Sequence, residues 1–308
     1  MVRFKGKTAF ITGGASGLGL AIAKRAAKEG MNVALADLRQ SALDEALPWF
    51  EENGARALGL CFSVTDRDAF EKAVDETEAK FGNIHLLCNN AGIGCAHGPL
   101  WEMSYKDTDM AIDVNLKSVL NGISAVVPRM LRHGEGGHIV STSSKNGLLP
   151  PPSLGLYNIT KGAVISLTET LAGELPDGYG ASVFCPGPFK TDLGRTSFEV
   201  PALLSGLTPT APPPPPPPPM FDDVDPDLDF EAMRNRELHP DEAGKLVFRG
   251  IRRNDLYIIT HSEYYEGVKA RCDAMLRAFP KTAPNDAFKR AMSFMVFNPV
   301  FTRQREYM

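Results

Sequence analysis

The stretch YNITK places a phenol, Tyr157, four residues before an ammonium, Lys161. On a helix this spacing is close to one turn, so both side chains would lie on one face. Removing a hydride from an alcohol requires a base for the hydroxyl proton, and a free tyrosine with a pKa of about 10 is a poor base at neutral pH. A neighbouring cation favours the phenolate. The pair therefore predicts a tyrosine base whose pKa Lys161 lowers, although solvated helix edges carry the same spacing.

A second chemical signal is the stretch TAFITGGASGLGLAIAKRAAKEG, which has the pattern of a strand, a glycine turn and a helix. The unpaired N–H groups and the dipole at the start of such a helix favour a pyrophosphate. Glycines at 13, 17 and 19 remove the Cβ atoms that would block its approach, and the hydroxyls of Thr12 and Ser16 can donate hydrogen bonds. The stretch predicts a dinucleotide site.

The choice of dinucleotide depends on the end of the second predicted strand. Asp37 lies there, eighteen residues after Gly19, where an acid would bond the ribose diol of an adenosine. A carboxylate at this point repels a 2′-phosphate, so we expect NAD rather than NADP. Arg39 can partly reverse the preference by pairing with a phosphate.

Short apolar runs alternate with longer amphipathic stretches along most of the chain. Runs that are apolar throughout suit a parallel sheet covered by helices on both faces. The rhythm predicts a single α/β domain with a doubly wound, Rossmann-type parallel sheet. The expected strands are 8–12, 32–37, 57–62, 84–90, 137–144, 181–187 and 255–260, and the expected helices are 17–30, 41–53, 66–81, 106–132, 160–175 and 240–253.

Two regions interrupt the rhythm. Residues 191–233 are proline-rich, and the eight consecutive prolines at 212–219 require polyproline II or disorder. We expect this insertion to be a loop that forms a substrate lid, in preference to a docking site for a proline-binding partner. The domain is expected to span 1–280, and the apolar extension 281–308 is expected to pack on a neighbouring subunit.

Composition excludes several classes of function. The 33 Lys and Arg residues against 37 Asp and Glu, with a pI near 5.9, give no basic field for nucleic acid or an anionic membrane. The first residues lead directly into a strand and lack the pattern of a signal peptide, so we expect a cytoplasmic protein. The five cysteines form no CxxC pair and the six histidines show no ligand spacing, so no metal site is expected.

From about 8 to 260 the chain resembles the short-chain dehydrogenase/reductase family. TGGASGLG at 12–19, NNAG at 89–92, an asparagine within DVNLKSV, YNITK at 157–161 and PGPFKT at 186–191 match its motifs in order, and a serine stands at the family's spacing, thirteen residues before the tyrosine. The resemblance implies that the catalytic residues are Ser144, Asn115, Tyr157 and Lys161. It implies that the cofactor is bound by Gly13, Ser16, Gly17, Leu18, Gly19, Asp37, Val64, Asn90, Ala91, Gly92, Tyr157, Lys161, Pro186, Gly187 and Thr191.

The resemblance also assigns roles. Ser144 would bond the substrate oxygen, Lys161 would hold the nicotinamide ribose, and Asn115 would support a water that relays the proton. Thr191 would bond the carboxamide, and the positive nicotinamide of the oxidised cofactor would act with Lys161 to favour the Tyr157 phenolate. Ser143 is a competing hydroxyl, and the spacing favours Ser144.

The chain departs from the family in two places. Ser63 stands where the family often has an aspartate for adenine, which leaves the backbone of Val64 to cover the ring. After the catalytic serine, Lys145 and Asn146 bring polar groups to the substrate mouth. Because Ser63 replaces the aspartate, we expect the contact to adenine to be weakened.

The segments beside the site are rich in Leu, Pro and aromatic residues, which suits a bulky, aromatic alcohol. Arg195 is the nearest cation and has the pattern of a surface residue. The stretches AVISLTET, CPGPFKTDL and 234–268 resemble dehydrogenases that oxidise benzylic alcohols of lignin-derived aryl ethers to ketones. The expected function is NAD-dependent oxidation of such a secondary alcohol. An NADPH-dependent ketoreductase and a non-catalytic nucleotide-binding protein remain alternatives, and a homodimer or homotetramer formed through 106–132 and 154–175 is expected.

Overall fold

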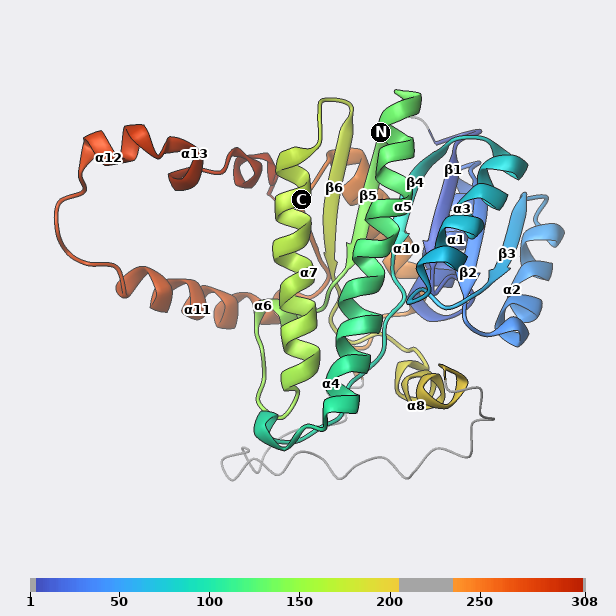
Figure 1. Cartoon of the computed structure of the whole chain (residues 1–308), viewed down its shortest axis with the longest axis horizontal. Helices are drawn as coiled ribbons and strands as arrows, with labels where there is room; N and C mark the ends of the chain where they lie inside the picture. Colours follow the sequence, from blue (N-terminus) through green and yellow to red (C-terminus); the bar gives the residue numbers. More distant parts are fainter. Residues whose placement is uncertain (1–3, 205–234, 307–308) are drawn as a thin grey trace.

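The computed structural model describes residues 4–204 and 235–306, and within them the chain forms one parallel sheet of seven strands (Figure 1). The strand order is β3-β2-β1-β4-β5-β6-β7. The strands are β1 (Thr8–Thr12), β2 (Asn32–Asp37), β3 (Ala57–Cys61), β4 (Ile84–Asn89), β5 (Gly137–Thr142), β6 (Tyr179–Cys185) and β7 (Tyr257–Ile259). The prediction of a doubly wound Rossmann-type sheet is confirmed.

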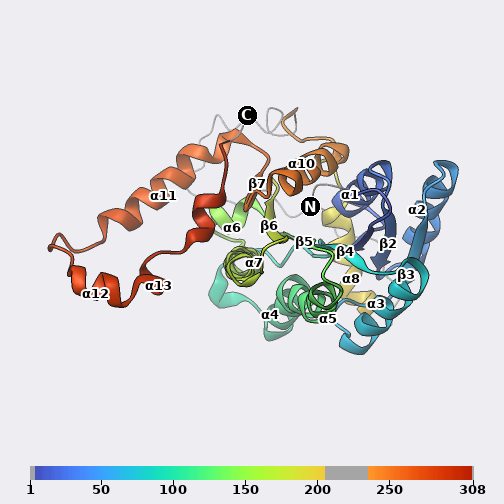
Figure 2. The ribbon, with the colours of Figure 1, turned by 90° about the horizontal axis from the view of Figure 1, so that it is seen from above.

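Helices cover both faces of the sheet (Figure 2). One layer contains α1 (Gly17–Lys28), α2 (Gln40–Glu52) and α10 (Pro240–Arg253), and the other contains α3 (Arg67–Phe81), α4 (Tyr105–Ile112), α5 (Ser118–His133) and α7 (Gly155–Glu174). The strands are apolar throughout, but alternate residues still point to opposite faces of the sheet and pack into two different cores. Ala9 and Ile11 of β1 join the core with α1 and α10, whereas Phe10 between them joins the core with α3 and α5.

The chain reverses its direction of winding at β1, which lies between β2 and β4. Ligands of open parallel sheets bind at such a switch point, beyond the carboxyl ends of the strands. The glycine turn after β1 occupies this position. Gly13 and Gly17 have φ values of 60° and 51°, which side-chain-bearing residues rarely adopt, so the turn requires glycine at both.

The helix predicted over 106–132 is composite. A π-helical segment, η2 (Asp113–Lys117), joins α4 to α5 and contains Asn115. The run Tyr105–His133 is long and apolar enough to cross a membrane, but much of it is buried against the sheet, as in a core helix of a globular domain. Insertions of this π type inside helices are frequent at functional sites.

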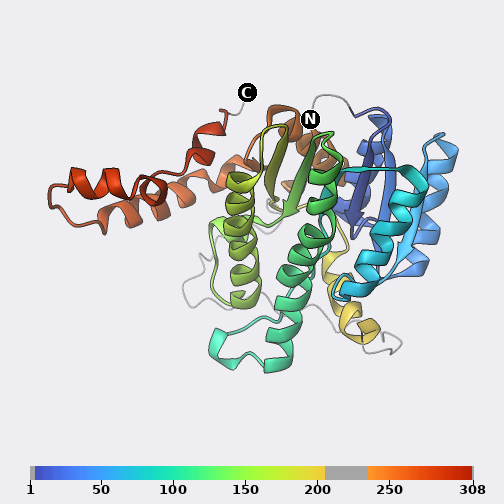
Figure 3. The same cartoon turned by 45° about the horizontal axis from the view of Figure 1, so that its top comes forward.

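The described part of the 191–233 insertion is not a loop. Residues Leu193–Leu204 form α8, with Pro201 inside it, at the end of the sheet where α4 and α7 begin (Figures 1 and 3). The prolines at 212–219 lie outside the described residues. The expectation of a loop was wrong for α8 because proline content dominated the interpretation of the whole segment, while 193–200 contains no proline.

Residues 265–306 form an arm that projects beyond α7 and returns, and the extension predicted from 281 is only its later part (Figure 3). The arm contains α11 (Tyr265–Arg277), α12 (Asp286–Ala291), α13 (Ser293–Val296) and η4 (Pro299–Arg303). The return is anchored by Val300, which is buried in the core with α5 and α7, and by the Gln304 side chain, which accepts a hydrogen bond from the Tyr257 N–H. Two shorter elements complete the site region, α6 (Lys145–Leu148) and η3 (Ser262–Tyr264).

Candidate active site

A cleft of about 690 Å³ lies at the carboxyl ends of the central strands. Such a volume is typical of sites for cofactors and small molecules. All but two of the residues predicted from the sequence line it; Gly19 and Asn115 lie just outside. The predicted residues on its wall are Gly13, Ser16, Gly17, Leu18, Asp37, Val64, Asn90, Ala91, Gly92, Ser144, Tyr157, Lys161, Pro186, Gly187 and Thr191.

The start of α1 forms the middle of the cleft floor. Ser16 is the N-cap residue and makes no side-chain capping bond, and the first turn carries no acidic residue. The positive end of the helix therefore faces the cleft with no carboxylate of its own first turn to neutralise it, which fits a pyrophosphate.

Gly19 acts by packing. A Cβ there would lie 2.0 Å from the Gly13 carbonyl oxygen and 2.6 Å from the Asn90 amide nitrogen. The Asn90 side chain donates to the Thr12 carbonyl at 3.2 Å, and the Asn90 N–H donates to the Thr12 hydroxyl at 3.0 Å. These contacts join the NNAG segment after β4 to the glycine turn after β1.

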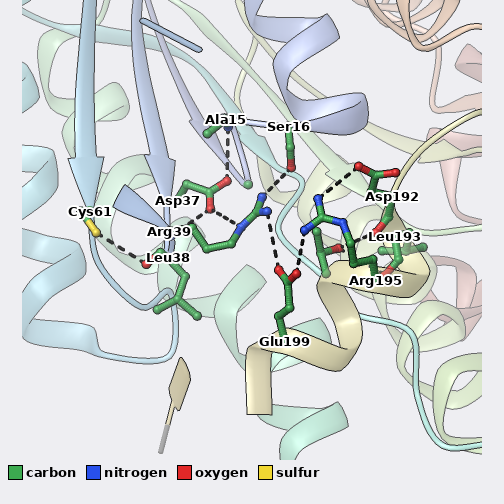
Figure 4. Close-up of polar contacts among 12 residues, drawn as sticks. Ala15, Ser16, Asp37, Leu38, Arg39, Cys61, Asp192, Leu193, Arg195 and Glu199 are labelled. Atoms are coloured by element: carbon green, nitrogen blue, oxygen red, sulfur yellow. Dashed lines mark hydrogen bonds and ion pairs between the residues drawn. The ribbon is translucent and has the colours of Figure 1, made fainter. Parts of the chain in front are cut away.

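At one end of the cleft Asp37 is held by backbone donors. Its carboxylate accepts hydrogen bonds from the N–H of Ala15 at 3.3 Å and of Arg39 at 3.1 Å (Figure 4). The Arg39 guanidinium lies 3.4 Å from the same carboxylate and donates to the Ser16 hydroxyl at 2.8 Å. The hydroxyl of Ser63 pairs with that of Thr65 at 2.8 Å.

At the other end Tyr157 and Lys161 share one face of α7, as their spacing predicts. The Lys161 ammonium lies 5.6 Å from the centroid of the Tyr157 ring and donates to the Thr142 carbonyl at 3.0 Å. Lys161 is 4% exposed, whereas Tyr157 is partly exposed. The pair is therefore a structural feature of the cleft and no solvated helix edge.

The two candidate serines have different partners. The Ser143 hydroxyl donates a hydrogen bond to the Lys161 carbonyl at 2.7 Å, and this bond joins α7 to the end of β5. The Ser144 hydroxyl accepts a hydrogen bond from the Asn146 N–H at 3.2 Å, and it lies near enough to the Tyr157 phenol to lower the pKa of that group. The geometry supports the preference for Ser144.

Asn115 is buried in η2, behind Lys161. Its amide exchanges two hydrogen bonds with the backbone of Ile93, at 2.8 and 2.9 Å. A Cβ at Gly92 would lie 3.1 Å from the Asn115 oxygen and 3.2 Å from the Lys161 nitrogen, so all three groups meet at one point.

Burial governs the protonation of the pair. Desolvation raises the pKa of Tyr157 from its ordinary value, and the hydrogen bond from Ser144 opposes this rise. Burial lowers the pKa of Lys161 to about 8. In the protein without a ligand, desolvation disfavours the charged forms of both side chains. The predicted phenolate depends on Lys161 together with the positive nicotinamide of a bound cofactor, so it stays a prediction.

The roof of the cleft comes from the segment after β6 and from α8. Thr191 lies over the glycine turn, since a Cβ at Gly17 would be 3.6 Å from its methyl group. The N–H of Gly94 donates to the Ser197 hydroxyl at 2.6 Å, which ties α8 to the loop after β4. Arg195 is half exposed and pairs with Glu199 on its own helix and with Asp192, which directly precedes that helix. It therefore has the surface position expected of it.

Lys145 and Asn146 do not reach the wall of the cleft. The Lys145 ammonium lies 5.5 Å from the centroid of the Tyr264 ring, and the Asn146 amide donates to the Asn158 side chain at 3.1 Å. Both side chains instead hold α6 against its neighbours.

A cluster missed by sequence reasoning lies at the opposite end of the sheet. The ligand-capable atoms of His85, His133 and Glu135 lie within 4.8 Å of one another. Each ring nitrogen already has a partner: His85 contacts the Thr8 N–H and Glu135, and His133 contacts the Ile84 carbonyl and the Glu135 N–H. Lys7 adds an ammonium 2.7 Å from Glu135. The cluster is a hydrogen-bonded network at this end of the sheet.

Comparison with known proteins agrees with this geometry. A family model described as short chain dehydrogenase matches residues 7–201. The C alpha-dehydrogenase of Sphingobium sp. (strain NBRC 103272 / SYK-6) is 32% identical over 98% of this chain and 97% of the relative. A short chain dehydrogenase/reductase from Burkholderia phymatum in complex with NAD is 33% identical, with a TM-score of 0.76, over 92% of this chain and 99% of that one.

A further solved structure holds the other cofactor. A short chain dehydrogenase from Burkholderia cenocepacia J2315 in complex with NADP is 28% identical, with a TM-score of 0.66, over 83% of this chain and 96% of that one. The glycine turn, the Tyr157–Lys161 pair and these similarities lead to one conclusion. The chain belongs to the short-chain dehydrogenase family, and it is an NAD(P)-dependent oxidoreductase that acts on alcohols.

Proposed function

We propose that this enzyme oxidises a bulky, aromatic secondary alcohol to the ketone with NAD. The observation that carries the proposal is the arrangement along one cleft. A phenol, a serine hydroxyl and a buried lysine converge at one end, and a carboxylate lies at the other. Between them is a helix start whose first turn carries no acidic residue. This order matches the reacting ring, the pyrophosphate and the adenosine ribose of a dinucleotide.

Each residue of the site has a role that its position supports. The bound nicotinamide would supply the acceptor for the hydride that leaves the alcohol carbon. Tyr157 takes the hydroxyl proton, and Ser144 beside it bonds the same oxygen and orients it. Lys161 holds the ribose and keeps a positive charge behind the phenol. Asn115 supports the water through which the proton leaves past Lys161.

The positive charge of the oxidised nicotinamide is required in addition to Lys161. Burial raises the pKa of Tyr157 in the protein alone, so the phenol is a poor base until a second cation is near. We infer that the tyrosine becomes a base only in the complex with the oxidised cofactor. This order avoids a buried phenolate in the unliganded protein.

The preference for NAD rests on Asp37. Its carboxylate is buried at the edge of the cleft and is fixed by backbone donors, so it can accept hydrogen bonds from a free 2′-hydroxyl. The preference for an aromatic alcohol rests on the similarity to the C alpha-dehydrogenase and on apolar side chains of α8, among them Leu193, Val200 and Leu204, that line the cleft.

We also propose self-association and a cytoplasmic location. Helices α5 and α7 expose Leu120 and Ile159, and the C-terminal arm exposes Phe279 and Phe288, which suits burial against further copies of the chain as a dimer or tetramer. The five cysteines are free thiols, which suits a reducing compartment.

The test is NADH formation with a panel of aryl secondary alcohols, compared between wild type and Tyr157→Phe. We expect turnover with NAD, and a loss of at least about a thousandfold in kcat in the variant with unchanged NADH binding. Silence of the wild type with every alcohol and both cofactors would contradict the proposal. Faster reduction of the ketones with NADPH would favour the ketoreductase, and unchanged turnover in the variant would exclude Tyr157 as the base.

A further inference from the structure

Arg39 is contacted from two parts of the chain that lie far apart in sequence (Figure 4). Asp37 and Ser16 approach its guanidinium from the sheet edge, at 3.4 and 2.8 Å. Glu199 approaches from α8, with its carboxylate 4.0 Å away. The second oxygen of Glu199 accepts a hydrogen bond from Arg195 at 2.6 Å. Glu199 therefore lies between two arginines and bridges α8 to the adenosine end of the cleft.

The bridge is more sheltered than an ordinary surface ion pair. The side chains of Arg39 and Glu199 are 15% and 19% exposed, whereas Arg195 is 49% exposed. The neighbouring tether between Ser197 and Gly94 holds α8 in register over the cleft, so Glu199 does not depend on its own ion pair for its position. Solvent screens such a pair less than it screens an exposed one.

We propose that Glu199 is a residue that determines cofactor specificity, because it holds the Arg39 guanidinium away from a 2′-phosphate. The inference rests on the proposed NAD site in this cleft. Arg39 is the group that can accept NADP, and Asp37 is the group that rejects it. Glu199 adds a second carboxylate to the same guanidinium from α8.

The two cofactors would meet this arrangement differently. A free 2′-hydroxyl bonds Asp37 and leaves the pair of Arg39 and Glu199 intact. A 2′-phosphate must draw Arg39 away from Glu199 and remain near two carboxylates. At distances of several ångströms in a partly buried site, one such charge changes binding by about tenfold.

The experiment measures binding directly and needs no substrate. Dissociation constants of NADH and NADPH are obtained by fluorescence titration for wild type, Glu199→Gln, Arg39→Gln and the double variant. Glu102→Gln removes the same charge from an exposed residue outside the cleft and is the matched control. Thermal melting verifies that each variant is folded.

We expect Glu199→Gln to bind NADPH about tenfold more tightly, with less than a threefold change for NADH. Glu102→Gln should leave both dissociation constants unchanged. When Arg39 is already replaced by Gln, the Glu199→Gln substitution should change the ratio of the NADPH to the NADH dissociation constant less than threefold. Equal shifts for both nucleotides, an equal effect of Glu102→Gln, or an undiminished effect without Arg39 would each overturn the inference. A wild type that binds neither nucleotide would overturn the proposed function as well.

Discussion

Lys161 should reduce the stability of the unliganded protein, and its replacement by Met should show this. Lys161 is 4% exposed, and burial lowers the pKa of its ammonium from 10.5 to about 8. At pH 7 the folded protein must therefore hold a desolvated charge that the unfolded chain exposes to water. Met has a similar length and carries no charge, so Lys161→Met removes this cost together with the catalytic cation.

The magnitude follows from the difference in pKa. The Lys161 pKa differs by about 2.5 between the unfolded and folded states. At about 1.4 kcal/mol for each pKa unit, this corresponds to about 3 kcal/mol in the free energy of unfolding. The variant also loses the donor to the Thr142 carbonyl, 3.0 Å away, which costs about 1–2 kcal/mol. The net expectation is a gain of about 1–2 kcal/mol and a rise of a few degrees in Tm.

The pH dependence provides the sharper test. Between about pH 8 and 10.5 the unfolded chain binds the Lys161 proton and the folded protein does not, so wild-type stability rises with pH in this window. The advantage of Lys161→Met should be largest below pH 8 and should shrink toward pH 10.5. Urea unfolding at pH 7, 8.5 and 10 measures it, with the exposed Lys106→Met as control. A variant less stable than wild type at pH 7, or an advantage independent of pH, would refute the reasoning.

Two further predictions concern stability. Gly19→Ala should lower the free energy of unfolding in urea by more than about 3 kcal/mol, because its Cβ would lie 2.0 Å from the Gly13 carbonyl oxygen. Gly194→Ala, which has open space around it, should be neutral or stabilising, and equal effects of the two substitutions would contradict this. Glu135 accepts a hydrogen bond from Lys7, and its pKa is lowered to about 2 from 4.5. The advantage of wild type over Glu135→Gln, about 1 kcal/mol at this exposed site, should be complete above pH 4.5 and lost as the pH falls toward 2; a difference constant with pH would argue against this linkage.

Local pattern was sufficient to predict the strands and most of the helices. The strands are short apolar runs bounded by turn residues, and each expected strand overlaps an observed one. The positions of Tyr157 and Lys161 were predictable because a helix of known period fixes them on one face. The glycine turn before α1 was predictable as well, because the positive φ values that require glycine depend only on the local chain.

Features that depend on distant segments were not predictable. The pair of Arg39 and Glu199 joins two segments separated by 160 positions, and no periodicity links them. Asn115, in the π-helical segment, makes two hydrogen bonds to Ile93, which lies on another loop. The direction of the Tyr157 pKa depends on burial, which the sequence does not state. The helix α8 was not predicted either, because the composition of 191–233 as a whole is that of a proline-rich loop, whereas 193–200 contains no proline.

The return of the C-terminal arm has a consequence for the outer edge of the sheet. β7 is a strand of three residues with β6 on one side only. The Gln304 side chain takes the hydrogen bond of the Tyr257 N–H, and Arg253 donates to the Glu306 carbonyl beside it. An uncovered strand offers its backbone to passing chains and starts fibrous aggregates. This final segment thus occupies part of the hydrogen-bonding edge of β7, which disfavours edge-to-edge pairing with a second sheet.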